Sequence, residues 1–306
     1  NCHVIDNLDK VGGQCAELYP EKPIYDIPSR PMVTGQQLTD ELLKQINPFK
    51  PTFHLNQQVD KIVKSEYGWV VETSIGKTIE AKCIVIAAGA GSFVPRKPPV
   101  ENINQFEDTN VFYAVRNKSL FENKKLLIVG GGDSALDWTN ELSKKSNVTL
   151  MHRRKDFRAA PDSVNKMQEL ENEGKVSFLK GVIKTIKNSS DNKITISYQA
   201  DEDIRDIEVD YLLPFFGLKM ELGPIANWGL NLNENLIKVD TEKFETSTSS
   251  IFAIGDINTY PGKLKLILSG FHEAALMAQE CFKYCYPDKK NKFQYTTSSK
   301  KLHKKL

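Results

Sequence analysis

The chain has 306 residues, about twice the length of a typical single domain, so two domains are expected. Its 40% hydrophobic and 26% charged residues are typical of globular proteins and exclude a disordered, collagen-like or coiled-coil chain, and no apolar run is long enough for a membrane helix. The net charge is only +2, so the composition does not favour general nucleic-acid binding.

The first element that the sequence predicts is a short strand, Cys2 to Asp6, which ends in a carboxylate. When such a strand is the second of a dinucleotide-binding unit, its acid accepts a hydrogen bond from the adenosine ribose. In the later unit described below, the first loop glycine, Gly130, lies 23 residues before the corresponding position, Arg153. Counted back from Asp6, that spacing runs past residue 1, so we expect a further segment of roughly 25–35 residues with the first strand, glycine loop and helix. Alternatively, Asp6 ends an ordinary edge strand.

Glycines and prolines interrupt the chain before regular structure resumes. Gly12 and Gly13, followed by Gln14, allow the backbone to approach a ligand closely. Residues 19–28, which begin with Tyr19, are punctuated by prolines and are too irregular for a helix or a strand. The pattern then predicts an amphipathic helix over 35–46 and strands over 59–64, 69–73 and 78–86, the last leading into the small residues 87–91.

The strongest local signal is a glycine-rich loop between a strand and a helix. An apolar run over 125–129 predicts a buried strand, and Leu136, Trp138 and Leu142 follow the loop at helical spacing. In this G-x-G-x-x-A loop the first glycine permits a tight turn, the second lets a pyrophosphate approach, and the alanine lets the helix pack closely. The candidate nucleotide-binding residues are Gly130, Gly132, Asp133, Ser134 and Ala135. The alternative is a glycine-rich turn in another kind of α/β unit.

The end of the next strand, expected over 147–151, indicates which nucleotide binds. An NAD site has an acid about 20 residues after the glycines, where it accepts a hydrogen bond from the ribose. This sequence instead has His152, Arg153 and Arg154, with Arg158 one helical turn later. Arginine cannot accept that hydrogen bond, but its planar donors bind a 2′-phosphate. NADP is therefore favoured over NAD, and the alternative is that these are ordinary surface arginines.

The rest of the chain continues the alternation of helices and strands. The patterns predict a helix over 162–173, strands over 176–179 and 211–216, a polar hairpin over 182–209, a strand over 250–254 and an apolar helix over 264–284. The strand over 250–254 leads into Gly255 and Asp256. The Asp256 carboxylate either binds a polyol hydroxyl or caps the following helix.

Residues 283–306 are strongly basic. They contain eight lysines and one acid, a charge of +7, which leaves −5 for residues 1–282. A basic tail on an acidic body predicts local attraction of an acidic partner; the alternative is a solvated tail without a partner.

Assembled, these motifs resemble the two-dinucleotide flavoprotein reductases, and most closely the ferredoxin–NADP reductases of the thioredoxin-reductase-like type. The residues that carry the resemblance are Asp6, Gly12-Gly13-Gln14, Ala87-Ala88-Gly89, the 130–135 loop, His152-Arg153-Arg154 and Ala253-Ile254-Gly255-Asp256. Two longer runs, within 12–26 and 255–263, look like that family's particular signature. The similarity covers essentially the whole chain.

The resemblance implies an α/β fold with two Rossmann-like dinucleotide-binding domains. An FAD domain, residues 1–116 and 243–306, would be interrupted by an NADPH domain, residues 117–242. The implied FAD contacts are Asp6 on the ribose, Gly13, Gln14 and Tyr19 near the flavin, Val59 at the adenine, Phe93 at the domain crossover, Asp256 on the ribityl–pyrophosphate side and Thr297 at the isoalloxazine. Where some family members stack a histidine on the flavin, this sequence has Tyr295, which keeps an aromatic face and removes a titratable group.

The cysteines separate this chain from the thioredoxin reductases that it also resembles. Five cysteines without a regular spacing favour a reducing cytoplasm. Thioredoxin reductases pass electrons through a C-x-x-C pair in the NADPH domain, whereas residues 117–242 contain no cysteine. Cys281 and Cys285 are four residues apart on an expected helix, a spacing too long for a ready disulfide and typical of packing. Electrons are therefore expected to leave directly from the flavin, to a one-electron carrier.

The sequence thus predicts a cytoplasmic, FAD-dependent enzyme that exchanges electrons between NADPH and an acidic carrier, either ferredoxin or flavodoxin. Because the protein mainly positions the two rings for hydride transfer, no catalytic side chain and no metal are expected. The resemblance also implies a homodimer, and the sequence gives no reason to expect a membrane or a nucleic acid as a partner. Two alternatives stay open: an NADPH-dependent flavin reductase whose acceptor is a quinone, a small disulfide or oxygen, and a non-catalytic fragment that binds only NADPH.

Overall fold

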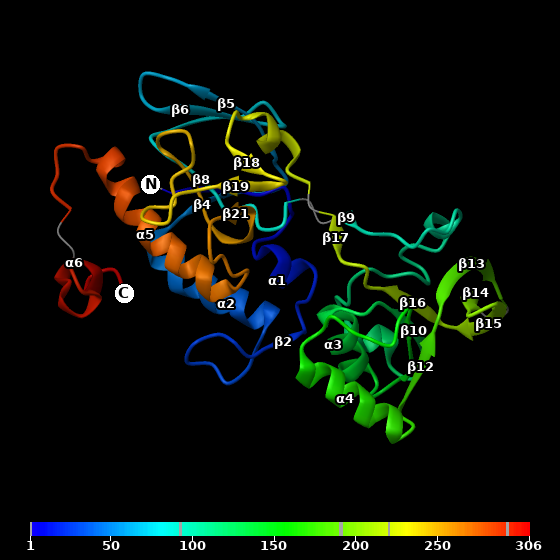
Figure 1. Cartoon of the computed structure of the whole chain (residues 1–306). Helices are drawn as coiled ribbons and strands as arrows, with labels where there is room; N and C mark the ends of the chain where they lie inside the picture. Colours follow the sequence, from blue (N-terminus) through cyan, green and yellow to red (C-terminus); the bar gives the residue numbers. More distant parts are fainter. Residues whose placement is uncertain (1, 92–93, 190–191, 220, 292–293) are drawn as a thin grey trace. The chain divides into compact units, whose positions relative to one another are not determined.

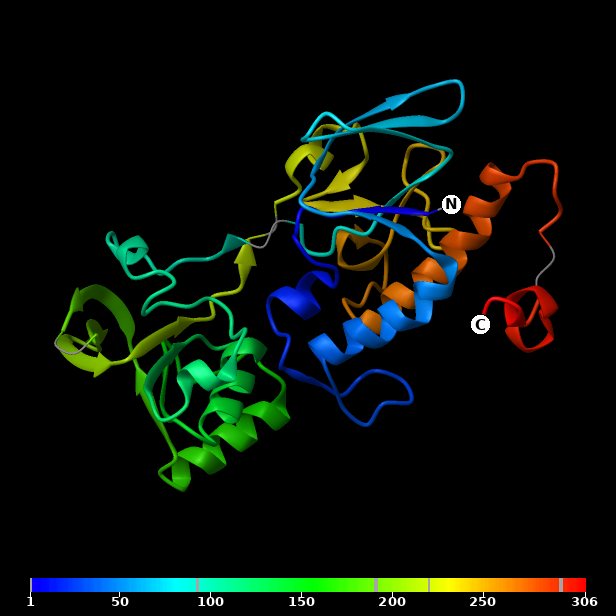
Figure 2. The same ribbon diagram turned by 180° about the vertical axis from the view of Figure 1, so that it is seen from behind.

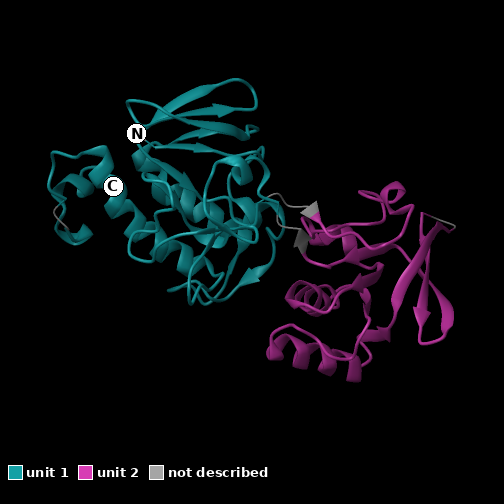
Figure 3. Ribbon diagram, turned by 45° about the horizontal axis from the view of Figure 1, so that its top comes forward, with its two compact units in different colours: residues 1–93, 220–306 teal, residues 94–219 magenta. Residues whose placement is uncertain are grey.

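The computed structural model describes residues 2–91, 94–189, 192–219, 221–291 and 294–306. Its internal contacts divide the chain into two compact units (Figure 3). Unit 1 comprises residues 1–93 and 220–306, and unit 2, residues 94–219, is inserted into it. The cofactor domains expected from the sequence, 1–116 with 243–306 and 117–242, are defined by what they bind and stay predictions.

The centre of unit 2 is a four-stranded parallel sheet in the order β12–β11–β10–β16, of which Figure 1 labels β10, β12 and β16. Its strands are β10 (Lys125–Val129), β11 (Asn147–His152), β12 (Val176–Lys180) and β16 (Tyr211–Pro214). Helices α3 (Asp133–Leu142) and α4 (Pro161–Asn172) supply the crossovers that parallel neighbours require. Because β10 and β11 run in the same direction, the loops that follow them leave the same edge of the sheet.

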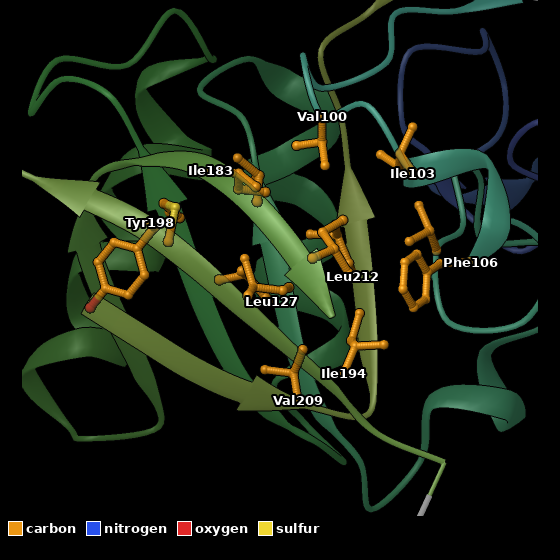
Figure 4. Packing of buried hydrophobic residues seen from close by; sticks show 14 residues of the cluster. Val100, Ile103, Phe106, Leu127, Ile183, Ile194, Tyr198, Val209 and Leu212 are labelled. Carbon is orange, nitrogen blue, oxygen red and sulfur yellow. The ribbon is translucent and has the colours of Figure 1, made fainter. Parts of the chain in front are cut away.

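An antiparallel sheet of three strands, β13 (Val182–Asn188), β14 (Ile194–Ala200) and β15 (Asp203–Val209), completes unit 2. The predicted single hairpin over 182–209 is therefore wrong, because a turn at 201–202 adds a third strand. Figure 4 shows Leu127 and Leu212 of the parallel sheet in one buried cluster with Ile183, Ile194 and Val209 of the antiparallel sheet. The shorter elements of this unit are β9 (Val94–Pro95), β17 (Leu218–Lys219), η2 (Ile103–Gln105) and η3 (Lys118–Phe121).

Unit 1 contains two parallel sheets of two strands each, and a third parallel pairing joins β19 (Leu236–Lys238) to β21 (Asn258–Thr259). β1 (His3–Ile5) pairs with β4 (Thr52–His54), and β8 (Ile84–Ile86) pairs with β20 (Ile251–Ala253) from the other end of the chain. An antiparallel sheet contains β5 (Val59–Lys64), β6 (Trp69–Thr73) and β7 (Thr78–Ala81). The single strand predicted over 78–86 is split, because β7 pairs with β6 whereas β8 pairs with β20.

The helices of unit 1 are α1 (Gly13–Glu17), α2 (Gly35–Ile46), α5 (Ile267–Cys285) and α6 (Lys300–His303). The predicted helix over 35–46 is confirmed, and it begins at a capping box in which Thr34 and Gln37 satisfy each other's backbone amides. The remaining elements are β2 (Pro23–Ile24), β3 (Val33–Thr34), β18 (Leu232–Asn233), η1 (Asn47–Phe49), η4 (Gly223–Asn227), η5 (Gly255–Ile257) and η6 (Thr296–Ser298). Within the described residues, no helix combines the length and the apolarity needed to cross a lipid bilayer.

Distant parts of the sequence meet in the core of unit 1. Trp69, Ile86, Ile237 and Ile251 belong to one buried hydrophobic cluster. The Trp69 indole donates a hydrogen bond to Ser250 Oγ (2.9 Å), and the Ile254 amide donates to the Ile86 carbonyl (3.0 Å). These contacts hold β20 beside β8, so that the segments 87–91 and 255–257, which follow the two strands, are neighbours.

Candidate functional site

The glycine loop of unit 2 follows β10 and leads directly into α3. A Cβ atom on Gly130 would lie 2.5 Å from the Phe215 carbonyl oxygen and 2.9 Å from Ala135 Cβ, and its φ of +155° also favours glycine. Gly132 is the N-cap of α3, faces open space and is followed by backbone amides without a side-chain cap. A helix N-terminus with free amides and open space in front fits a phosphate group.

The end of β11 packs directly on this loop. A Cβ atom on Gly131 would lie 2.4 Å from His152 Nε2, so only glycine leaves room for the imidazole. The His152 ring also stacks on Phe157 with centroids 5.6 Å apart. Burial, and then the charges of the nearby arginines, lower the pKa of His152, so the ring is largely neutral at pH 7. The loop that follows β11 is therefore fixed against the glycine loop.

Three arginine side chains are exposed beside that contact. Arg153, Arg154 and Arg158 form no ion pair with any residue that the structure describes, and all three act on His152 electrostatically. The Arg158 amide donates a hydrogen bond to the Gly131 carbonyl (2.7 Å). Uncommitted guanidinium groups at this edge of the sheet have the chemistry to bind a 2′-phosphate. The structure thus brings the predicted arginines and the glycine loop together.

The remaining predicted residues of the loop differ in what they do. Ala135 is fully buried against Gly130, as its small size suggested, and Ser134 is exposed. The Asp133 carboxylate accepts a hydrogen bond from the Ala160 amide (2.8 Å). The loop motif gave no hint of that partner, because it lies 27 residues further along the chain.

In unit 1, Asp6 follows β1, and its backbone and side chain are held separately. Its amide donates to the His54 carbonyl (2.9 Å), and its Oδ1 accepts from the Leu8 amide (3.0 Å). Burial raises the pKa of this carboxyl, although backbone hydrogen bonds oppose the rise. The Gln57 amide donates to the Asp6 carbonyl (3.0 Å), which brings half-buried Val59, at the start of β5, into the same region. The arrangement fits the predicted contacts with an adenosine.

A second group of predicted residues meets where α1 begins and where β8 and β20 end. The Gln14 side-chain amide lies 3.3 Å from the position that a Cβ atom on Gly89 would take, and Gly13 faces open space. The Cys15 thiol donates to Tyr19 Oη (3.8 Å). Burial raises the pKa of Tyr19, and the charges of Cys15 and Asp256 raise it further, so Asp256 acts on this segment although it is more than 200 residues away in the sequence. This set of an amide, a phenol and a carboxylate fits the polar edge and the hydroxyls of FAD.

Sequence reasoning missed the buried network that holds the Gly255–Asp256 turn. Glu273 of α5 is fully buried and forms an ion pair with Lys263, whose side chain is 7% exposed. The Glu273 carboxylate also accepts from the Gly255 amide (2.7 Å), Asn258 Nδ2 (2.8 Å) and Tyr260 Oη (2.9 Å). Lys263 Nζ in turn donates to the Gly255 carbonyl (2.9 Å).

The titration of Glu273 reflects this network. Burial acts to raise the pKa of its carboxyl, but the hydrogen bonds from Lys263, Gly255 and Tyr260 outweigh burial and lower the pKa. The signature run within 255–263 contains Tyr260 and Lys263, and the apolar helix contains a glutamate, but nothing in the sequence indicated that these residues meet.

Two predicted residues, Tyr295 and Thr297, lie elsewhere in unit 1. Phe93 lies outside the described residues. Tyr295 and Thr297 are exposed in the segment before α6. Lys305, which follows α6, contacts η1, where its Nζ lies 5.6 Å from the centre of the Phe49 ring. Figures 1 and 2 show α6 beyond the end of α5, apart from α1. Tyr295 and Thr297 therefore lie with α6, in a different part of unit 1 from the helix α1 that carries Gln14.

Three of the cysteines gather where β8 begins and α5 ends. The Cys83 thiol donates to the Cys281 carbonyl (4.0 Å) and also interacts with the Cys285 side chain. Hydrogen bonding to Cys281 and burial raise the pKa of Cys83, and burial and the proximity of Cys83 raise that of Cys285. The Cys83 and Cys285 thiols therefore stay protonated at neutral pH, and protonated thiols are poor nucleophiles.

The two sites and the interrupted α/β architecture define a class of redox protein that uses two dinucleotides. A family model described as "Pyridine nucleotide-disulphide oxidoreductase" matches residues 10–277, and the chain belongs to that family. Curated relatives are more specific. A protein of Parvibaculum lavamentivorans named ferredoxin–NADP reductase is 59% identical over 100% of this chain and 90% of its own length. A protein of the same name from a Bradyrhizobium species is 57% identical over 99% of this chain and 90% of its own length. The resemblance recognised in the sequence is thereby confirmed.

Solved structures agree at the level of the fold. The thioredoxin reductase of Lactococcus lactis has a TM-score of 0.77 and 23% identity, covering 93% of this chain and 91% of that one. The thioredoxin reductase of T. acidophilum also has a TM-score of 0.77, with 20% identity and coverage of 94% and 90%. The predicted fold, two Rossmann-like domains of the thioredoxin-reductase type, is confirmed.

Proposed function

We propose that this chain is an FAD-dependent ferredoxin–NADP reductase. The observation that carries the proposal is the group of three uncommitted arginines beside the glycine loop, in a chain whose relatives at 55–59% identity are named ferredoxin–NADP reductase. The name of these relatives indicates ferredoxin as the electron carrier. The arginines indicate a preference for NADPH over NADH.

Unit 2 provides the residues for NADPH. The glycine loop and the free amides of α3 would bind the pyrophosphate, and Arg153, Arg154 and Arg158 would bind the 2′-phosphate. The largely uncharged His152 ring packs against Gly131 and so fixes the start of the segment that carries these arginines. Two phosphate subsites a ribose apart would fix the adenosine half of the coenzyme and leave the nicotinamide half free to reach the flavin.

Unit 1 provides the residues for FAD. Asp6 would bind the adenosine ribose, Val59 would lie at the adenine, and Asp256 would bind ribityl hydroxyls. Gly13, Gln14 and Tyr19 would lie along the flavin. Phe93 and Thr297 are proposed as FAD contacts from the family resemblance alone, because Phe93 lies outside the described residues and Thr297 lies in the segment before α6. FAD, when bound, accepts two electrons as a hydride and releases them singly. The buried Lys263–Glu273 pair keeps Asp256 in place by holding both the amide and the carbonyl of Gly255.

The route of the electrons is proposed to avoid thiols. Residues 117–242 contain no cysteine, and the Cys83 and Cys285 thiols have raised pKa values. A carrier protein must then approach the flavin itself. The exposed lysines at 300, 301, 304 and 305 would attract an acidic carrier, which is ferredoxin or, as a second choice, flavodoxin. We place the enzyme in the cytoplasm, since all five cysteines are unpaired, and we expect a homodimer.

A comparison of acceptors tests this function. The chain supplied with FAD should oxidise NADPH far faster than NADH, and ferredoxin should accelerate the oxidation. The rate with ferredoxin should fall steeply with rising salt, because exposed charges are screened, while the rate with a neutral quinone should stay flat. Turnover with quinones or small disulfides and no effect of ferredoxin would show a different flavin reductase. NADPH binding without retained flavin would show a protein that only binds the nucleotide.

A further inference from the structure

The segment that bears the three arginines is tied to the glycine loop at both ends. We call residues 153–160 the arginine loop. At its start, the His152 ring fills the space above Gly131. Near its end, the Arg158 amide donates to the Gly131 carbonyl (2.7 Å), and the Ala160 amide donates to Asp133 Oδ1 (2.8 Å). The last of these is the only one of the three contacts that uses a side chain of α3.

Asp133 is well suited to this second role. Ala160 is the N-cap of α4, and its methyl group cannot accept a hydrogen bond from its own helix. Pro161 follows at the first helical position and has no amide hydrogen. The Asp133 carboxylate thus serves the start of α4 from another helix, and its negative charge is also favourable near the N-termini of α3 and α4.

A negatively charged carboxylate is unexpected beside a phosphate site, and the hydrogen bond to Ala160 explains why one is present here. If Asp133 only faced the ligand, its charge would repel both the pyrophosphate and the 2′-phosphate. Its hydrogen bond instead orders the end of a loop that carries four positive side chains, three of them arginines, and one acid. Since such a loop otherwise loses conformational entropy when the ligand binds, a contact that orders it beforehand strengthens binding.

We propose that Asp133 is a positioning residue for coenzyme choice, because it holds the arginine loop in the conformation that accepts a 2′-phosphate. The inference rests on the proposed function, which assigns this loop to NADPH. The pyrophosphate subsite is formed by the backbone before and after Asp133, so it depends less on the hydrogen bond to Ala160. Loss of the contact therefore weakens ligands that carry a 2′-phosphate more than those that lack it.

Calorimetric titration of the full chain with 2′,5′-ADP and with ADP tests this directly, without flavin turnover. Because only 2′,5′-ADP carries a 2′-phosphate, the ratio of the two affinities measures how well the arginine loop binds that phosphate. In Asp133→Ala the ratio should fall roughly three- to tenfold, as expected for one lost hydrogen bond. Asp133→Asn keeps an acceptor oxygen and should retain the ratio. The matched control is Asp137→Ala: Asp137 accepts from Ser163 Oγ (2.7 Å) between the same two helices but outside the arginine loop, so its ratio should not change.

Each contrary result has a distinct meaning. An unchanged ratio in Asp133→Ala overturns the inference, as does an equal loss in Asp133→Asn, which would show that charge rather than the hydrogen bond matters. If the unaltered chain has no preference for 2′,5′-ADP, the proposed NADPH function fails instead.

A measurement without variants covers the case in which Asp133→Ala does not fold. Hydrogen exchange at the Arg158 and Ala160 amides should slow on addition of 2′,5′-ADP and change little with ADP. Equal effects of both nucleotides would contradict the inference.

Discussion

Unit 2 builds its candidate nucleotide site from one continuous stretch, residues 125–160, whereas unit 1 assembles its site from residues 6–19, 87–91 and 255–257. In unit 2, the loops that follow the neighbouring parallel strands β10 and β11 are joined by two hydrogen bonds, from the Arg158 amide to the Gly131 carbonyl and from the Ala160 amide to the Asp133 carboxylate. In unit 1, the neighbours β8 and β20 come from opposite ends of the chain, and a buried ion pair holds the turn that follows β20. The first site depends on local geometry, and the second depends on the stability of the whole unit. Four predictions follow from that contrast.

The largest effect is expected at Glu273. Glu273→Gln leaves the buried Lys263 charge unpaired, which should cost about 3–5 kcal/mol of unfolding free energy and weaken the retention of FAD. Chemical denaturation and the flavin content after desalting are the measurements. The control is Glu280→Gln, because Glu280 pairs with exposed Lys283 (2.5 Å) and should change stability by less than about 1 kcal/mol. Similar losses in both variants would contradict the role of the buried pair.

A smaller effect, confined to unit 2, is expected at the arginines. Arg153→Gln should lower kcat/KM for NADPH by roughly 10- to 100-fold, the equivalent of about 1.5–3 kcal/mol for a lost charged hydrogen bond, and leave NADH turnover nearly unchanged. Steady-state kinetics with both coenzymes provide the test, and Arg205→Gln on β15 serves as a surface control. An equal loss with NADH would mean that Arg153 supports the fold and does not select the coenzyme.

The glycine loop separates packing from binding. Gly131→Ala places a methyl group against the His152 ring and should lower the unfolding free energy by about 1–3 kcal/mol. Gly132→Ala fills only open space, so it should leave stability within about 1 kcal/mol while weakening the binding of NADPH and NADH alike. Thermal unfolding and nucleotide titration distinguish the two. A stable Gly131→Ala protein would show that His152 does not pack on the loop.

The pH dependence of stability gives the smallest and most specific effect. Because the pKa of Glu273 is lowered from its usual 4.5, its contribution is complete above that value and is lost as pH falls through the folded-state pKa. The stability difference between the unaltered chain and Glu273→Gln should therefore shrink in acid, as the Glu273 carboxylate is protonated and its ion pair with Lys263 is lost. Urea unfolding between pH 7 and pH 3 measures it. A constant difference would mean that the loss in Glu273→Gln has another cause.

The sequence was most informative where the residues of a site lie close together along the chain. Gly130 and Gly132 could be interpreted from the turn and the helix N-terminus that they precede, and the arginines from their distance to those glycines. The partner of Asp133, the Ala160 amide, could not be predicted. The number of residues between Arg154 and Ala160 does not determine which way the backbone of that loop runs. The pairing of β8 with β20, and the partners of Glu273, depend on contacts between residues 84–86 and 251–273 that no periodicity encodes.

The most direct test of the account is anaerobic titration of the FAD-supplied chain, after removal of excess flavin, with NADPH and then with NADH. The visible flavin bands should be retained after desalting and should bleach rapidly with NADPH and slowly with NADH. A colourless protein would contradict the assembly of an FAD site from residues 6–19, 87–91 and 255–257. A yellow protein that bleaches equally with both coenzymes would contradict coenzyme selection by the arginine loop.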